Sequence, residues 1–60
     1  HQLEETILIF ISNEGARSRA EIEAATGYKR SWVLKELKRL VDEGKLAVVG
    51  SGKNTKYQLK

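Results

Sequence analysis

The segment that most constrains the fold is residues 18–44, SRAEIEAATGYKRSWVLKELKRLVDEG. Ser18 and Glu21 have the spacing of a capping box, in which two side chains satisfy backbone N–H groups at the start of a helix. Gly27 follows one short helix later, and glycine takes the positive φ that ends a helix without steric cost. The segment therefore predicts two helices joined by a tight turn.

The second of these helices, predicted over 30–43, has two unlike faces. Its apolar residues recur at the spacing of one helical face, and they are Val33, Leu37, Leu40 and Val41. The opposite face is basic and polar, and it carries Ser31, Lys35, Lys38, Arg39 and, at its margin, Trp32. One face is expected to enter the core, and the other is expected to present positive charge.

A further helix is predicted at the start of the chain, over 2–13. Its apolar residues form a stripe at helical spacing, namely Leu3, Ile7, Phe10 and Ile11, with Leu8 widening it. A helix of this kind cannot bury its stripe alone, so we expect it to pack across the two later helices.

The chain ends in a predicted β-hairpin over 45–59. KLAVV and TKYQL read as two short strands with alternating apolar residues. The loop between them, GSGKN, has glycine and asparagine for the positive φ values that hairpin loops need.

This order of elements resembles the winged helix-turn-helix superfamily of DNA-binding domains, of the transcriptional-regulator type. The resemblance covers nearly the whole chain. It rests on the small residue and glycine of the turn, the basic helix, the pattern L-x-x-L-x-x-x-G-x-L, the glycine-rich basic loop and an x-Y-x-L strand. It implies a single α+β domain over residues 1–60, with three helices and a C-terminal two-stranded wing (residues 45–59).

Two positions depart from the family pattern. Lys29 stands where the family often has a Ser or Thr N-cap, which predicts a less well capped helix. Leu34 stands at a position that is commonly polar in the family.

The charge distribution favours a polyanionic partner. Residues 1–27 carry two basic and five acidic side chains, whereas residues 28–60 carry nine basic and three acidic ones. Such asymmetry gives the domain an oriented field whose basic side suits nucleic acid. The plainer interpretation is ordinary surface lysine.

The resemblance implies double-stranded DNA as the partner, with the helix over 30–43 in the major groove. Ten residues are the expected contacts. Those expected to reach base edges are Arg30, Ser31, Trp32 and Lys35, and those expected nearer phosphates are Lys38 and Arg39. The wing is expected to contribute Lys53 and Lys56, and the start of the helix over 18–26 is expected to contribute Arg17 and Arg19.

Trp32 and Leu34 leave alternatives open. They are compatible with half-buried packing, with contacts to thymine methyl groups or sugars, or with a protein interface. The competing function is therefore a protein–protein interaction winged helix that docks through these two residues. Recognition of RNA or of an unusual duplex form would use the same basic surface.

Catalysis, metal binding and cofactor binding lack the necessary residues. The sequence has no cysteine and one histidine, at its first position, and no metal-ligand spacing. We therefore expect no enzyme, no cofactor, no metal and no small-molecule substrate. The apolar run from Ile7 to Ile11 is too short to span a membrane, so we expect a cytoplasmic, nucleoid-associated or nuclear protein. We expect the chain to be one domain of a longer protein, and we expect homodimerisation or tethering to strengthen its binding.

Overall fold

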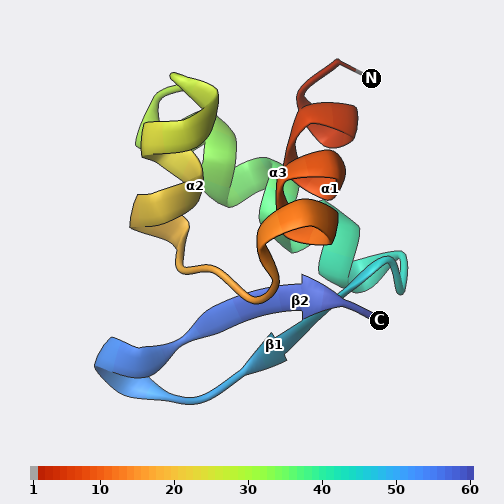
Figure 1. Ribbon diagram of the computed structural model, residues 1–60, viewed down its shortest axis with the longest axis vertical. Coiled ribbons are helices and arrows are strands. Elements are labelled where there is room, and N and C mark those ends of the chain that lie inside the picture. The colour runs from red at the N-terminus through yellow and green to blue at the C-terminus, as the bar shows by residue number, and fades with distance from the viewer. Residues whose placement is uncertain (1) are drawn as a thin grey trace.

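The structure, a computed structural model, describes residues 2–60. Three helices are followed by a two-stranded antiparallel sheet (Figure 1). In chain order the elements are α1 (Gln2–Glu14), α2 (Arg19–Thr26), α3 (Arg30–Asp42), β1 (Leu46–Val49), a single 3₁₀ turn (Gly52–Asn54) and β2 (Lys56–Leu59). The predicted α+β fold, with three helices and a C-terminal wing, is confirmed.

The core is formed by one face of each helix and by the first residue of β1. Its members are at most 2% exposed, and they are Leu3, Ile7, Ile11, Ile22, Val33, Leu37, Leu40 and Leu46. The predicted stripes of α1 and α3 supply most of this set, with Phe10 and Val41 packed against it half-buried. Burial of these side chains supplies the main favourable term in folding.

Local signals fix how α2 meets α3. The Ser18 hydroxyl accepts from the backbone N–H of Glu21, and the Glu21 carboxylate accepts from the N–H of Ser18 at 3.0 Å. Gly27 ends α2 with φ 75°, and its N–H donates to the carbonyl of Glu23 at 2.8 Å. Lys29, at the N-cap of α3, makes no side-chain capping bond. The turn is therefore specified by α2 and Gly27 more than by the start of α3.

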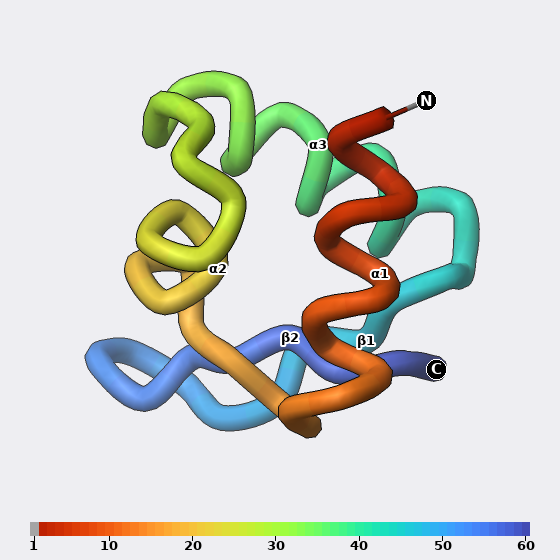
Figure 2. The backbone as a smooth tube through the Cα atoms, turned by 45° about the horizontal axis from the view of Figure 1, so that its top comes forward, coloured from red at the N-terminus to blue at the C-terminus, as the bar shows by residue number. Residues whose placement is uncertain are grey.

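The hairpin lies across one end of the helical bundle, with its loop on the side of α2 (Figures 1 and 2). The register runs from Leu46 opposite Leu59 to Val49 opposite Lys56. This pairing places Leu46, Val48, Tyr57 and Leu59 on one face, where Leu46 is buried, Tyr57 is half-buried, and Val48 and Leu59 are exposed.

The connector between α1 and α2 pairs with β2 through a single antiparallel β-bridge. The Arg17 N–H donates to the carbonyl of Tyr57 at 3.0 Å, and the Tyr57 N–H donates to the carbonyl of Arg17 at 2.8 Å. The wing is therefore hydrogen-bonded to the segment that leads into α2. Within residues 2–60, no helix has the length and apolar character needed to cross a bilayer.

Candidate nucleic-acid interface

The outer face of α3 is solvent-exposed along its length. It presents Arg30, Ser31, Lys35 and Lys38, all of them exposed. Trp32 and Leu34 are exposed as well, at 54% and 39%. Two residues along a helix are about 200° apart around its axis, so Trp32 and Leu34 lie on opposite flanks of α3.

The flank with Leu34 faces the wing across two grooves. Leu34 and Tyr57 line both grooves and form the wall between them. The first, of about 330 Å³, is completed by Ser18, Arg19, Ala20, Gly52, Lys53 and Thr55. The second, of about 370 Å³, is completed by Lys38, Val41, Asp42 and Val48. The start of α2, the outer side of α3 and the wing therefore form one continuous surface.

Toward its C-terminal end, the opposite flank of α3 carries a charged network around Arg39. Its guanidinium donates to Glu4 of α1 at 2.6 Å, to Glu43 at 2.7 Å, and to Glu36. Glu36 is only 8% exposed. Lys45 joins the network through its Nζ, 2.6 Å from the second carboxylate oxygen of Glu4.

The network shifts the pKa values of its members in the directions that opposite charges require. Hydrogen bonds from Lys45 and then Arg39 lower the pKa of Glu4 to about 2, against the opposing effect of burial. The hydrogen bonds that Arg39 donates to Glu36, Glu4 and Glu43 raise the pKa of its guanidinium. The bond to Glu4 raises the pKa of Lys45. The network fastens α3 to α1 and to the residue before β1.

Arg39 was predicted to lie near DNA phosphates; the structure places its guanidinium in this network, and the phosphate contact stays a prediction. The helical period puts Arg39 on an exposed flank, but Glu4, 35 residues away in sequence, covers that flank. A guanidinium that already holds three carboxylates has few donors left for a phosphate.

Pairing divides the basic residues into two groups. Within residues 2–60, ion pairs with carboxylates involve Arg17, Arg19, Arg39 and Lys45. The other basic side chains of that range have no such partner, and they are Lys29, Arg30, Lys35, Lys38, Lys53, Lys56 and Lys60. Six of these seven belong to the start of α3, its outer face or the wing loop and β2.

Two predicted contacts near α2 are held by neighbours on the same segment. Arg17 lies 3.5 Å from Glu14 and 3.7 Å from Glu21, and Arg19 pairs with Glu23. Such local pairs between partly exposed side chains are weak in water. Either arginine can exchange its carboxylate for a phosphate at little cost, so both remain predicted contacts.

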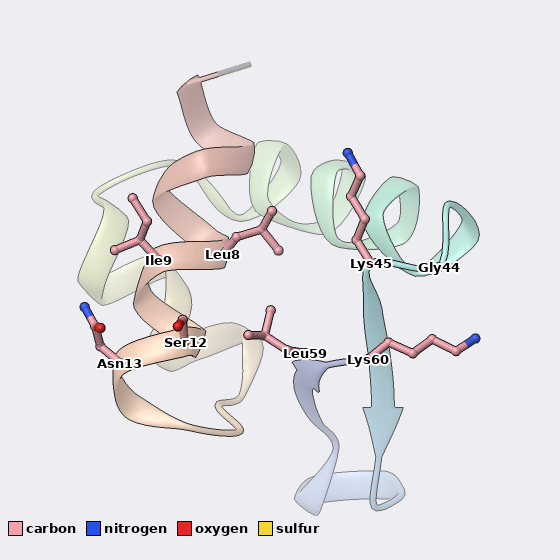
Figure 3. A pocket seen from close by; sticks show the side chains of 8 residues that line it. All are labelled: Leu8, Ile9, Ser12, Asn13, Gly44, Lys45, Leu59 and Lys60. Carbon is pink, nitrogen blue, oxygen red and sulfur yellow. The ribbon is translucent and has the colours of Figure 1, made fainter.

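A third groove lies on another side of the molecule, between α1 and the end of β2. Its volume is about 540 Å³, and it is lined by Leu8, Ile9, Ser12, Asn13, Gly44, Lys45, Leu59 and Lys60 (Figure 3). Lys60 is thus an unpaired lysine away from α3, which makes it a useful control position.

Comparisons with known proteins place this geometry in a family. No protein-family model matches the sequence, and no curated protein does. Solved structures do match. Stf76 from the Sulfolobus islandicus plasmid-virus pSSVx is 32% identical with a TM-score of 0.85, over 97% of this chain and 80% of Stf76. The Zα domain of Carassius auratus PKZ, in complex with Z-DNA, is 22% identical with a TM-score of 0.89, over 98% of this chain and 94% of that domain. The DIP2311 protein from Corynebacterium diphtheriae is 25% identical with a TM-score of 0.88, over 98% of this chain and 11% of that protein.

The chain belongs to the winged helix-turn-helix superfamily. In winged-helix terms, α3 occupies the place of the recognition helix, and residues 45–59 form the wing. Four predicted contacts share the outer side of α3, namely Arg30, Ser31, Lys35 and Lys38. Lys53 of the wing and Leu34 of α3 line the same groove. The backbone N–H of Ser18 lowers the pKa of Glu21 most, and the charges of Arg17 and Lys56 add to this effect.

The sequence analysis missed two features of this surface. Tyr57 was expected only as a strand residue, yet it forms the wall between the two grooves and bonds to Arg17. Its alternation with Leu59 was the available signal, since it places both residues on the face toward the helices. Lys35 covers the Trp32 ring, with its Nζ 5.8 Å from the ring centroid, and the i, i+3 spacing was the signal for that contact. In the described range 2–60, no cluster of His, Asp or Glu is placed to hold a metal ion.

Proposed function

We propose that this domain binds double-stranded DNA, with α3 in the major groove and the wing lysines on flanking phosphates. The domain would serve as one module of a transcriptional regulator or of another protein that acts on nucleic acid. Membership of the winged helix-turn-helix superfamily supports DNA binding in general. The location of the unpaired cations supports this particular surface.

The observation that carries the proposal is the contrast in pairing. A cation held by carboxylates brings little net charge to a partner, whereas an unpaired lysine can release counterions from a phosphate. Three unpaired lysines face this surface: Lys53 of the wing lines the first groove, Lys38 of α3 lines the second, and Lys35 lies on the exposed outer face of α3. A duplex lying along α3 would meet all three.

Salt dependence tests this surface directly. Affinity for a random-sequence duplex should fall linearly in a log–log plot against salt, with a slope of about −0.9 for each neutralised phosphate. Lys35→Ala and Lys53→Ala should each weaken binding and flatten the slope by about one unit. Lys60→Ala, which removes an unpaired lysine from the third groove, should leave the slope unchanged.

Equal salt slopes for these three variants would contradict the proposal, because a lysine would then contribute to binding without regard to its position.

The duplex form is tested in the same titration. The Zα neighbour is in complex with Z-DNA, so circular dichroism of an alternating CG duplex would show whether this domain favours a left-handed form. The result we expect is binding to right-handed DNA, with no inversion of the spectrum.

The competing function is a protein-docking winged helix, and the exposure of Trp32 and Leu34 favours it. The two side chains lie on opposite flanks of α3, however, and do not form one apolar patch. Protein docking would make the emission of Trp32, the sole tryptophan, depend on protein concentration without DNA. DNA binding would make the emission of Trp32 depend on added duplex.

A lone module should bind weakly, so tethering or dimerisation would raise the affinity.

A further inference from the structure

Trp32 is the largest exposed apolar side chain of α3, and it stands clear of the grooves. It is 54% exposed and lines none of the three grooves described above. Lys35 makes a cation–π contact with it, with Nζ 5.8 Å from the ring centroid. A ring held in this way is neither part of the core nor part of the surface that faces the wing.

The rest of the outer face of α3 offers cations for guanine and no amide side chain for adenine. Specific readers of the major groove rely on bidentate contacts, from Arg or Lys to guanine and from Asn or Gln to adenine. Arg30, Lys35 and Lys38 can contact guanine, but α3 contains no Asn or Gln to contact adenine. An indole offers a single N–H donor. Trp32 therefore has little to contribute at a fully paired base step.

The charge around Trp32 indicates the chemistry of its partner. Lys29, Arg30 and Lys35 surround it in sequence, and none has a carboxylate partner within residues 2–60. The nearest acidic residue in sequence, Glu36, is buried and held by Arg39. Lysine is depleted at protein interfaces. A nucleotide, by contrast, supplies both a phosphate for the lysines and a flat π-face for the ring.

We propose that Trp32 is a stacking site for an unpaired base, so that the preferred ligand is duplex DNA carrying an unpaired nucleotide. The proposal rests on the DNA binding proposed above and adds the class of DNA. Lys35 would orient the ring, and Arg30 and Lys29 would hold the phosphates beside the extruded nucleotide. Recognition would then depend on DNA structure more than on sequence.

The test compares three probes of identical sequence: a fully paired duplex, the same duplex with one bulged adenine, and the same duplex with an abasic nucleotide in the bulge. The abasic probe keeps the bend and the backbone but lacks the base. We expect the adenine bulge to bind about tenfold more tightly than either other probe, since base–aromatic stacking of this kind corresponds to roughly that factor. We also expect it alone to quench Trp32 emission.

Two variants separate stacking from a structural role. Trp32→Ala should bind all three probes with the affinity of the paired duplex, and Trp32→Phe should restore part of the preference. Lys53→Ala should weaken all three probes equally, because it acts on phosphate.

Each other outcome overturns the inference in a distinguishable way. Equal affinity for the adenine and abasic bulges would remove the stacking site and leave DNA binding intact. Binding to none of the probes at low salt would remove the proposed function as well. Emission that changes with protein concentration alone would assign Trp32 to a protein contact.

Discussion

The two flanks of α3 use charge in opposite ways. On the flank toward α1, Arg39 is surrounded by Glu4, Glu36 and Glu43, and the network holds the helix in place. On the flank toward the wing, Leu34 lies between grooves bordered by lysines that have no carboxylate partner. The number of basic residues on a helix therefore says little about its binding surface. On α3, pairing separates Arg39, which holds the fold, from the lysines available to a ligand.

The strongest test of this comparison makes the same Leu→Ala substitution twice, once on the buried side of α3 and once on the side toward the wing. Leu37 is fully buried, whereas Leu34 is 39% exposed. Leu37→Ala should cost about 2–5 kcal/mol of unfolding free energy, because it leaves a cavity in the core. Leu34→Ala should cost about 1 kcal/mol or less. Urea denaturation of both variants measures the difference, and equal losses would mean that Leu34 is a core residue.

The second test sets the unpaired lysines against the paired arginine. Replacing Lys35, Lys38 and Lys53 together by Ala should flatten the log–log salt slope of DNA binding by about three units, with little change in melting temperature. Arg39→Ala should leave the salt slope unchanged and lower the melting temperature, because it leaves Glu36 buried without its partner. If Arg39→Ala flattened the slope by one unit and left the melting temperature unchanged, the sequence-based assignment of Arg39 to phosphate would be right.

A smaller effect is expected in the wing loop. Gly50 has φ +77°, and a Cβ there would collide with the backbone carbonyl of Asn54. Gly52 has φ +58° with open space around it. Gly52→Ala should cost roughly 1–2 kcal/mol for the left-handed backbone alone, and Gly50→Ala should cost more and shift the position of Lys53. Thermal unfolding ranks the two variants, and an equal loss would indicate that the loop relaxes around the added methyl group.

The smallest effect is the acid dependence of the network. The pKa of Glu4 is lowered from 4.5 to about 2, so the folded state binds its proton less readily than the unfolded state. Glu4 therefore stabilises the fold above about pH 4.5, and this contribution is lost as the pH falls toward 2. Glu4→Gln should give a shallower fall in melting temperature over that interval. Parallel curves for the two proteins would show that the pairing with Lys45 and Arg39 adds no stability.

Local signals predicted the fold well because they lie within single elements. Ser18 and Glu21 formed the expected capping box, Gly27 took the expected positive φ, and the apolar stripe of α3 became core. Each of these outcomes depends on residues a few positions apart, where helical geometry fixes which side chains meet.

The parts of the site that sequence reasoning missed depend on contacts between distant elements. Arg39 and Glu4 meet only after α1 packs on α3, and Leu34 and Tyr57 share a wall only after the wing folds back. The Arg17–Tyr57 pairing has no periodic signal, because a single bridge needs one residue on each side. A helical period shows that a residue is on the surface, but it does not show which neighbour covers it.

The most direct measurement is an NMR titration of the isotopically labelled domain with a DNA duplex at low and moderate salt. We predict amide shifts over residues 30–38 and 50–56 that fade as salt rises, with Glu4, Lys45 and Lys60 unmoved. Shifts centred on Lys60 and the groove between α1 and β2, or no shifts at low salt, would contradict the division between paired and unpaired cations as the basis of binding.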